Sequence, residues 1–498
     1  MRENPFVPLV EELVPLPDPV RCCEQLADLP YRIFLDSATK GAQVGRYSFL
    51  AADPVAVVRS KGSRTECGAR IVPEDALDAV RELLAPYATD PLPGLPPFQG
   101  GAAGYLAYDW GRVHERIPPP RHDDLGVPDV VLGVYDWVLA WDHEVSRAWL
   151  ISTGMLETSP PARTRRAADR AAVVLERLKS ADATAARQVP WPLQGCDLPV
   201  EAEASVVPKA PTYPVAAGWA DPRLELRSSF THAGYLEAVA RVREYIFAGD
   251  IFQANISQRF DAPLSEPPWS LYRRLRTQNA APFAAYLDFP EAVVLSASPE
   301  RFLRVDVDGH VETRPIKGTR PRGVGPEHDA ALGQALTASA KDRAENLMIV
   351  DLLRNDLSRV CAPGTVHVPE LFALEHYATV HHLVSTVVGD LAPGADALTL
   401  LRAAFPGGSI TGAPKVRAME IIAELEPSER GIYCGAIGYW SLTGALDCSI
   451  VIRTAVARAG RVYFSAGGGI VADSDPEQEY RETLDKARGM IDALKTSQ

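Results

Sequence analysis

The sequence of 498 residues contains no apolar run that approaches the about 18–20 residues needed to cross a bilayer. Its first segment, MRENPFVPLVEELVPLP, has early prolines and charges of both signs. It therefore lacks the basic start and the apolar stretch that mark a secretory signal peptide. These two absences predict a cytoplasmic protein that does not associate with a membrane.

Cysteine is scarce and is not arranged for metal binding. The seven cysteines are odd in number, and none of them forms a CxxC motif or a Cys/His spacing typical of zinc. We expect reduced thiols in a reducing compartment at these positions, which are Cys22, Cys23, Cys67, Cys196, Cys361, Cys434 and Cys448.

An excess of positive charge is also absent, because 51 basic residues face 64 acidic ones and the formal net charge is −13. This balance argues against binding to nucleic acid or to an anionic membrane surface. It leaves an anionic substrate open, since a few local lysines and arginines decide that. The apolar share of 46% is typical of a globular protein, and the chain is long enough to bury a large core.

Residues 1–183 combine strand-like runs with turns. The runs are 31–38, 47–58 and 129–141, and the glycine-rich stretch 98–105 lies among them. A helix is predicted at about 161–180. Residues 184–228 are rich in proline and alanine and have no periodic apolar face, which indicates a linker or an extended surface excursion.

The pattern tightens in residues 229–498. Tyr235, Val239, Val242 and Ile246 recur at helical spacing before Gly249. Strands are predicted at 251–260 and 293–298, and helices at 341–357, from near 413 and from near 474. Because helices and strands are mixed rather than strictly alternating, we expect an α+β fold.

The last predicted helix carries a stripe of charge. Ser474 is the expected N-cap, followed by Pro476 and Glu477. Glu479, Glu482 and Lys486 then share one face at helical spacing. Such a face could hold a metal and an anionic ligand, or it could be a solvated surface with ion pairs along the helix.

Two further residues are ambiguous by pattern alone. Glu345 lies among apolar residues, so it is either a surface charge or a buried carboxylate that is paired or binds a metal such as magnesium. Lys317 lies between apolar and glycine neighbours. It is either an exposed loop lysine or a desolvated one, whose lowered pKa would make it a nucleophile.

Two glycine clusters, 405–412 and 465–470, each precede a predicted helix. They are either tight turns or sites where backbone N–H groups bind carboxylates or phosphates. Neither matches the phosphate-loop or dinucleotide pattern. His382, in an apolar run, is typical of a hydrogen-bonded structural histidine.

Taken together, seven blocks make residues 229–495 resemble the chorismate-utilising enzymes. They are GDIFQANISQRF (249–260), SASPERF (296–302), TRPIKGTRPRG (313–323), KDRAENLMIVDLLRNDL (341–357), TVHHLVSTVVGDL (379–391), FPGGSITGAPKVRAMEII (405–422) and SAGGGIVADSDPEQEYRETLDKA (465–487). The N-terminal part resembles the family more loosely, through FLDSA, GRYSF and FQGGAAGYLAYDW. The resemblance implies one large α/β sandwich of two antiparallel sheets with helices outside, to which the N-terminal part contributes.

The resemblance also implies site residues. Glu345 and Glu482 resemble magnesium ligands, with Glu479 close by, and the ion would bind the ring carboxylate of chorismate. Glu300 resembles the general acid for departure of the C4 hydroxyl group, and His382 would lie near the ring. The implied contacts to substrate are Thr319, Thr411, Tyr433, Arg453, Gly468, Gly469 and Lys486.

Two positions discriminate between branches of the family. Members that add water to chorismate have a lysine at the position of Gln253, whereas ammonia-using members have glutamine. Lys317 resembles the branch that aminates C4, where the branch that forms anthranilate has alanine. Asn255, which we expect with Gln253 at the substrate, and the stretch 279–283 also resemble the C4 branch. The expected product is 4-amino-4-deoxychorismate, a precursor of p-aminobenzoate and folate, formed through a covalent Lys317 intermediate.

The chain shows no cysteine in a glutaminase-like context, so a separate glutamine amidotransferase subunit is the expected source of ammonia. Ser37 resembles the serine of a tryptophan pocket, but its surroundings differ from the feedback-regulated pattern, and we expect no strong inhibition by tryptophan. The alternatives are the large subunit that forms anthranilate and a non-catalytic homologue that only binds a ligand or the glutaminase.

Overall fold

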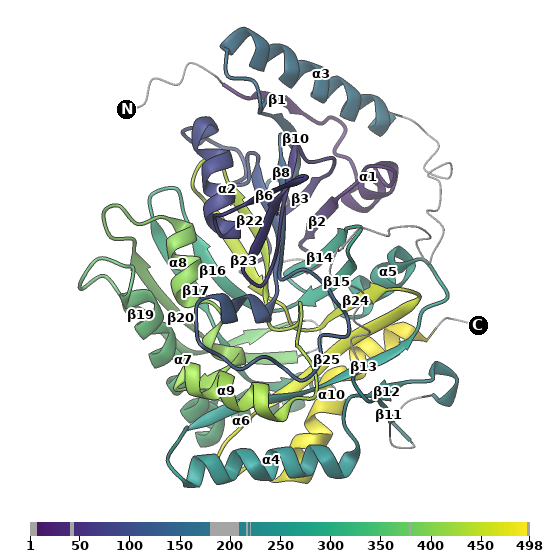
Figure 1. Cartoon of the computed structure of the whole chain (residues 1–498), viewed down its shortest axis with the longest axis vertical. Helices are drawn as coiled ribbons and strands as arrows, with labels where there is room; N and C mark the ends of the chain where they lie inside the picture. Colours follow the sequence, from purple (N-terminus) through teal and green to yellow (C-terminus); the bar gives the residue numbers. More distant parts are fainter. Residues whose placement is uncertain are drawn as a thin grey trace.

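The computed structural model of the chain describes residues 7–39, 44–179, 209–215, 218–219, 221–377 and 380–495. These residues form two antiparallel sheets that pack against each other, with helices on the outer faces (Figure 1). This is the predicted α+β sandwich.

The first sheet has 13 strands among the described residues, and β21 (Gly412–Ala413) pairs with one of its strands, β13. The remaining order is β1 (Leu9–Glu12), β10 (Arg147–Ser152), β9 (Trp137–Asp142), β3 (Tyr47–Ala51), β2 (Arg32–Asp36), β14 (Phe283–Asp288), β15 (Val293–Ser298), β24 (Thr454–Arg458), β25 (Arg461–Ile470), β13 (Gln253–Pro263), β12 (Arg227–Ser228) and β11 (Tyr213–Pro214).

The second sheet has 12 strands in the same described part, and β19 (His367–His376) pairs with one of them, β20. The remaining order is β18 (Ile316–Pro321), β20 (Val380–Asp390), β17 (His310–Arg314), β16 (Arg301–Val305), β23 (Leu446–Ile450), β22 (Ala436–Ser441), β7 (Gly101–Leu106), β8 (Val130–Tyr135), β4 (Ala56–Lys61), β5 (Arg64–Cys67) and β6 (Arg70–Val72).

The helices cover the sheets from outside, as Figure 1 shows for α4 and α10 below the first sheet. Their bounds are α1 (Pro19–Gln25), α2 (Ala76–Leu84), α3 (Pro160–Lys179), α4 (His232–Phe247), α5 (Pro268–Gln278), α6 (Pro326–Ala338), α7 (Ala340–Ser358), α8 (Ala397–Ala404), α9 (Lys415–Leu425) and α10 (Pro476–Leu494). Short 3₁₀ turns are η1 (Ala85–Tyr87), η2 (Tyr108–Val113), η4 (Pro222–Leu224) and η5 (Gly408–Ile410).

Alternation along the strands separates two apolar layers. In β2, Ile33 packs between the sheets with residues such as Phe49 and Tyr105, whereas Phe34 faces the helices with Tyr235 and Leu271. This period of two is what a strand buried on both faces requires. The inter-sheet core therefore joins strands from both ends of the chain.

Two predicted strand-like runs are each divided between the sheets. The run 47–58 supplies β3 to the first sheet and β4 to the second, and the run 129–141 supplies β8 and β9 in the same way. The second run breaks at Asp136, which is fully buried beside Arg166 and Arg170. A buried carboxylate needs such cationic partners. Asp136 thus lies where the chain passes from the second sheet to the first.

The two predicted parts of the chain share both sheets. β2 pairs with β14, and β7 pairs with β22, so strands from residues 1–183 lie beside strands from residues 229–498. Of the predicted linker, residues 184–208, 216, 217 and 220 lie outside the described residues. The rest of it forms β11, η4 and β12 at the edge of the first sheet.

The predicted helices lie close to their expected bounds, but the cap of α10 was assigned to the wrong residue. Asp475, not Ser474, is the N-cap, and its carboxylate accepts from the backbone N–H of Gln478. The hydroxyl of Ser474 instead donates to Glu479. Among the described residues, none of the helices has both the length and the apolar composition that a bilayer crossing requires.

A buried ion pair fastens β13 to the segment after α9. Glu426 accepts from Arg430, at 2.7 Å, and from both the backbone N–H and the hydroxyl of Ser257, at 2.8 Å. Arg430 also donates to the carbonyl groups of Asn255 and Ile410. The side chains of Glu426 and Arg430 are 6% and 3% exposed, so neither charge has water as a substitute partner.

Replacing Glu426 with alanine should lower the free energy of unfolding by about 3–5 kcal/mol, because it leaves Arg430 buried without a counter-charge. Urea unfolding followed by fluorescence measures this. Glu424→Ala is the control, since Glu424 is an exposed residue near the end of α9 and should change stability by less than about 1 kcal/mol. Equal losses of unfolding free energy from the two substitutions would contradict the stabilising role of this ion pair.

Candidate active site

The candidate site is built on the paired strands β13 and β25, where Asn255 lies opposite Gly469 and Ile256 opposite Gly468. A Cβ atom on Gly469 would overlap the side-chain amide of Gln253 and lie 2.9 Å from Glu345 Oε1. A Cβ atom on Gly468 would lie 3.1 Å from Glu479 Oε2. The second glycine cluster is therefore part of a strand rather than a turn, and its missing side chains leave room for polar groups from α7, α10 and β13.

Lys317 and Glu345 form an ion pair within this site. The Nζ atom of Lys317, on β18, lies 3.0 Å from Glu345 Oε1 on α7, and the two side chains are 13% and 18% exposed. Burial acts to lower the pKa of Lys317, but the carboxylates of Glu345, Glu300 and Glu482 outweigh it and the pKa is raised. Of the two readings left open for Lys317, the buried one holds, but its pKa is raised rather than lowered, because its neighbours in space are acidic.

The charged stripe on α10 faces the site. Lys486 Nζ lies 2.6 Å from Glu482 Oε1 and donates to the carbonyl of Gly467 at 2.9 Å. The Lys486 ammonium lowers the pKa of Glu482, whereas burial raises the pKa of Glu479. The stripe is thus more than a solvated surface, since Glu479 is 5% exposed and bonded to Ser474.

Arg453 contacts α10, the helix that carries the charged stripe, and its backbone has an uncommon conformation. Its φ angle is 53°, a region that favours glycine, and its guanidinium donates to the carbonyl of Lys486. Burial lowers the pKa of Arg453, and the neighbouring Tyr433 and Glu482 act in the opposite direction. Burial also raises the pKa of Tyr433 well above its ordinary value. Backbone strain of this kind gathers at functional sites.

Glu300 is the buried acid of the site, with 5% of its surface exposed. It lies between β15 and β16, where its backbone N–H donates to the Ser298 hydroxyl and its carbonyl accepts from the N–H of Ile450. Burial raises the pKa of Glu300 to about 7, against the opposing effects of a hydrogen bond from Ser409, the charge of Lys317 and the N–H of Ile316. A carboxyl group with this pKa can hold a proton at neutral pH.

Thr319 and His382 form a hydrogen-bonded pair across β18 and β20. The Thr319 hydroxyl lies 2.9 Å from Nδ1 of His382. Burial, together with the charge of Arg453 and the neighbouring His381, lowers the pKa of His382 to about 4. His382 is therefore a neutral imidazole. It is hydrogen-bonded, as expected from its place in an apolar run.

The remaining predicted residues line the start of β13. Thr411 is fully buried, and its hydroxyl donates to the carbonyl of Gly407 at 3.1 Å. The Asn255 side chain donates to the carbonyl of Ser409 at 3.0 Å. Gln253 is fully buried, and its Nε2 donates to Glu345 at 3.4 Å, while its Oε1 has no hydrogen-bond partner among the described residues.

Ser37 lies apart from this group, in the N-terminal part. Its hydroxyl donates to the carbonyl of Tyr47 at 2.6 Å, and the side chain is buried. Residues 40–43, close to it in sequence, are outside the described residues. Tryptophan binding at Ser37 stays a prediction, as does the absence of strong inhibition.

The site brings together carboxylates that suit a divalent cation. Glu345, Glu479 and Glu482 surround the two glycines without Cβ atoms, and hard oxygen donors are what magnesium takes. Lys317 and Lys486 neutralise two of these carboxylates. In the described part of the chain, no three acidic, histidine or cysteine side chains are already grouped to hold a metal ion. The donor chemistry fits magnesium, and the lysines occupy the oxygens that the ion would use.

Sequence reasoning missed two residues of this site. Ser409 belongs to the first glycine cluster, where only the backbone was considered, yet its hydroxyl group acts to lower the pKa of Glu300. Lys341 at the start of α7 acts on the pKa values of Glu479 and Glu482 by its charge. Ser409 lies within one of the sequence blocks that carry the family resemblance. Its place in that block could have identified it as a residue of the site.

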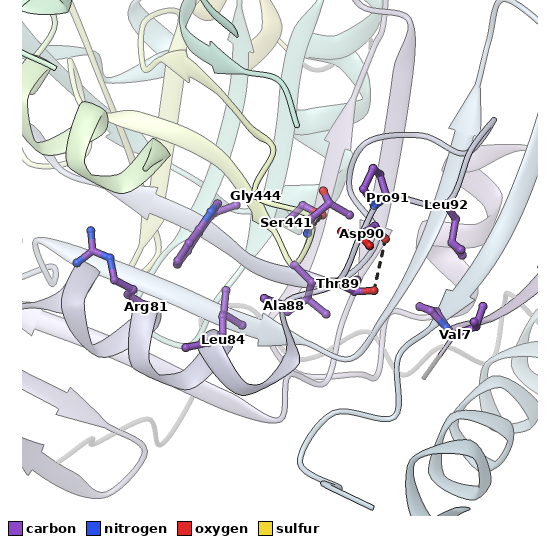
Figure 2. A pocket seen from close by; sticks show the side chains of 15 residues that line it. Val7, Arg81, Leu84, Ala88, Thr89, Asp90, Pro91, Leu92, Ser441 and Gly444 are labelled. Carbon is purple, nitrogen blue, oxygen red and sulfur yellow. Dashed lines mark hydrogen bonds between the residues drawn. The ribbon is translucent and has the colours of Figure 1, made fainter. Parts of the chain in front are cut away.

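A separate groove of about 630 Å³ lies on the opposite part of the second sheet (Figure 2). It is bordered by Arg81 and Leu84 of α2, the loop 88–92, the turn 440–444 and Val7. None of the predicted site residues lines it. Its lining is mostly apolar, and Arg81 is already paired with Asp78 and Asp396.

Substitution of Gly469 by alanine should lower kcat/KM by about 10²-fold, the effect expected when catalytic groups are displaced by about 1 Å. The added Cβ atom would overlap Gln253 and crowd Glu345. Gly468→Ala is the matched variant, since its Cβ atom would lie 3.1 Å from Glu479 Oε2 and 3.6–3.7 Å from Glu482 and Lys486, without the overlap found at Gly469, and its loss should be much smaller. Steady-state kinetics with chorismate compares the two, and a smaller loss in Gly469→Ala would contradict the placement of these groups.

Comparisons with known proteins identify the family of the chain. The profile of the chorismate binding enzyme family matches residues 30–492. Aminodeoxychorismate synthase component 1 of Salmonella typhimurium is 42% identical over 94% of this chain and 93% of its own length. Anthranilate synthase component 1 of Thermus thermophilus is 40% identical over 98% of this chain and 97% of its own. The crystal structure of anthranilate synthase component I from Streptococcus pneumoniae superposes with a TM-score of 0.73 at 32% identity, covering 90% of this chain and 92% of that one.

Proposed function

The chain belongs to the family of chorismate-binding enzymes, and from this premise we propose that it aminates chorismate at C4 to form 4-amino-4-deoxychorismate. The observation that carries the proposal is the position of Lys317. Its Nζ atom lies 3.0 Å from Glu345, and the charge of the buried acid Glu300 also acts on this amine, so an amine and a proton donor lie in one region of the site. The relatives named aminodeoxychorismate synthase component 1 point to the same product.

The proposed reaction has two halves. In the first, the ammonium of Lys317 releases a proton to solvent, its neutral amine forms a bond to C2 of the ring, the two ring double bonds shift, and the C4–O bond breaks. Glu300 gives its proton to the departing hydroxyl group, which leaves as water. In the second, ammonia forms a bond to C4, the double bonds shift back, and the bond between C2 and Lys317 breaks. The new ammonium group at C4 returns a proton to Glu300, and Lys317 regains its proton from solvent. The overall exchange is one hydroxyl group for one amino group.

Gln253 supports ammonia as the second nucleophile. Its buried Oε1 has no hydrogen-bond partner among the described residues, and its amide lies over Gly469 beside Glu345. An unpaired buried acceptor is costly, and an N–H donor such as ammonia would satisfy it. Glutamine cannot act as the base that activation of water would need.

Binding of the two substrate carboxylates is assigned to the cationic side of the site. Arg453 and Lys486 supply positive charge, Tyr433 a hydroxyl group, and Gly468 and Gly469 backbone without side chains. Thr319, Thr411 and the neutral His382 would line the ring. The side-chain amide of Asn255 donates to the carbonyl of Ser409, so its contact with substrate would have to come from its other atoms or after this bond opens.

Magnesium is proposed as the cofactor, held by Glu345 and Glu482 with Glu479 nearby. Bound there, the ion would withdraw charge through the ring carboxylate at C1. The three carboxylates around Gly468 and Gly469 support this assignment.

A separate glutamine amidotransferase subunit is proposed to supply ammonia, and the name component 1 of the relatives is consistent with a second component. Three buried cysteines are unlike an activated nucleophile. Burial raises the pKa of Cys22 and Cys23 to about 12 and that of Cys361 to about 11. An activated thiol has a lowered pKa instead.

Amination at C2 with loss of pyruvate, giving anthranilate, is the second candidate. Relatives named anthranilate synthase component 1 are 40% identical over nearly the whole chain, so overall identity does not separate the two reactions. Lys317 favours C4, because an amine near C2 would occupy the carbon that anthranilate formation must aminate.

Product identification tests the proposal. The purified protein is incubated with chorismate, magnesium and ammonium at mildly alkaline pH without a partner subunit, and the products are analysed by mass spectrometry and fluorescence. We expect a product that retains the enolpyruvyl group, that a lyase converts to p-aminobenzoate, and that disappears when EDTA removes magnesium. Fluorescent anthranilate with released pyruvate would overturn the assignment to C4. Unchanged turnover in EDTA would overturn the magnesium site.

A further inference from the structure

We propose that Asn346 is a positioning residue for the reaction, and that together with Ser385 it sets the place of Glu345 opposite Lys317. The inference deepens the proposed function and rests on it for the roles of Glu345 and Lys317. It concerns two side chains that are 0% exposed and that lie outside the set of site residues predicted from the sequence.

Asn346 joins helix α7 to strand β20 through both ends of its amide group. Its Nδ2 donates to the backbone carbonyl of Leu383 at 3.3 Å, and its Oδ1 accepts from the hydroxyl of Ser385 at 2.6 Å. The carbonyl of Leu383 can only accept, so the orientation of the amide is fixed by its partners. Both polar atoms of this buried side chain are therefore satisfied by one strand.

Ser385 is held in turn by the segments beside β20. Its backbone N–H donates to the carbonyl of Pro315 at 3.2 Å, and its hydroxyl accepts from the N–H of Phe372, on β19, at 3.1 Å. Phe372 has a φ angle of 59° and lies where the register of β19 against β20 shifts, between Glu370 and Ala373. A residue in such an irregularity is left out of the strand pairing, and here its N–H bonds to the serine hydroxyl instead.

Each end of this network lies beside a residue of the candidate site. The end on α7 directly follows Glu345, the end on β20 directly follows His382, and the end before β18 lies two residues from Lys317. The ion pair of Lys317 with Glu345, at 3.0 Å, therefore joins two segments that buried hydrogen bonds already hold together. Support of this kind locks the geometry of functional side chains.

A second polar contact between α7 and β18 is open to water. Arg320 donates to Asp342 at 3.0 Å, and the two side chains are 38% and 14% exposed. Water can replace the partners of such an ion pair at little cost, whereas a buried amide that loses its partners is left unsatisfied. We therefore assign the placement of Glu345 to Asn346 and Ser385 rather than to the exposed ion pair.

Replacement of Ser385 by alanine removes the donor to Asn346, and Asn346→Ala removes the other side of the same bond. In each variant a crystal structure should show the distance from Lys317 Nζ to Glu345 Oε1 lengthened from 3.0 Å to more than about 4 Å, the limit of an ion pair. With chorismate, magnesium and free ammonia, kcat should fall about tenfold or more, because small displacements of catalytic groups have effects of this size.

The double variant tests whether the two residues act through one bond. Because each substitution breaks the same contact, Asn346→Ala combined with Ser385→Ala should lower kcat by no more than about twofold beyond the larger single loss. Ser60→Ala is the control for loss of a buried hydroxyl group, which in Ser60 donates to the Gly62 carbonyl, and it should change neither the distance nor kcat. Thermal unfolding of each variant shows that it is folded at the assay temperature.

The distance and the rate separate this inference from the proposed function. A merely structural role for Asn346 and Ser385 would lower the midpoint of thermal unfolding and leave the ion pair near 3.0 Å, which would overturn the inference whatever the rate. Fully additive losses of kcat in the double variant would also overturn it. A lengthened ion pair with an unchanged kcat would confirm the placement of Glu345 and overturn the roles proposed for Glu345 and Lys317. These readouts do not depend on which carbon is aminated, because kcat can be followed on either product.

Discussion

Replacement of Lys317 by alanine is expected to lower the rate of 4-amino-4-deoxychorismate formation by roughly 10⁴-fold or more, the scale seen when a covalent nucleophile is removed. The amine would form the bond to C2 in the first half-reaction, and the described residues place no other lysine against Glu345 in an ion pair. Single-turnover kinetics with chorismate and free ammonia measures the loss without a partner subunit.

Lys317→Arg is the informative companion variant. Arginine keeps a positive charge beside Glu345 but is not a nucleophile at any working pH, since its pKa exceeds about 12. If charge alone matters, Lys317→Arg retains activity, and if the covalent bond matters, it loses as much as Lys317→Ala. Lys209→Ala, at an exposed position away from the site, serves as the surface control.

The covalent intermediate can also be sought directly. With ammonia withheld, acid-quenched protein should gain the mass of chorismate less one water, on the peptide that contains Lys317. An unchanged rate in Lys317→Ala would mean that the covalent proposal is wrong. Anthranilate and pyruvate from that variant would instead mean that Lys317 acts by blocking C2.

The neutral variant Glu300→Gln is expected to lower kcat by about 10²–10⁴-fold, the range attributed to general acid catalysis. The pKa of Glu300 is raised to about 7, so the carboxyl group is protonated below that pH and ionised above it. The direction follows from this: the step that needs the proton is fast on the acid side and slows as pH rises through about 7. In the glutamine variant the residual rate should lack this limb.

Glu291→Gln is the matched control for that experiment. Glu291 is a buried glutamate, 6% exposed, that pairs with Arg59 and Tyr31 in the N-terminal part of the sandwich. Its replacement should lower stability while leaving kcat and the pH profile unchanged at temperatures well below unfolding. A Glu300→Gln variant that retains both its rate and its alkaline limb would remove Glu300 as the acid.

Much of the fold was readable from local patterns. The strand 293–298 and the helix 341–357 match β15 and α7 within a residue or two, because apolar periodicity and caps are local properties. The division of 47–58 and 129–141 between the two sheets was not readable. Both halves of each run are buried on both faces, so their periodicity is the same whichever sheet they join.

The site divides in the same way. The sequence blocks identified the candidate side chains of the site. The structure places six of them around one pair of glycines: Glu345, Lys317, Glu479, Glu482, Lys486 and Gln253. The pKa of Lys317 is raised, whereas the sequence offered either an exposed lysine or a desolvated one with a lowered pKa. Its flanking residues are apolar, but the carboxylates that surround it come from α7, α10 and the segment before β16.

The sequence by itself determined the family, the order of the elements and the identity of the acids and amines, because these follow from residue types at fixed spacings along one strand or helix. Only the tertiary structure decided their protonation and their partners. Desolvation and Coulomb energy depend on what lies within a few ångströms, and the groups that set them for Glu300 (Ser409, Lys317 and Ile316) come from other segments of the chain. The pairing of Asn255 with Ser409 has the same origin, since a hydrogen bond between β13 and η5 exists only once the two are folded together.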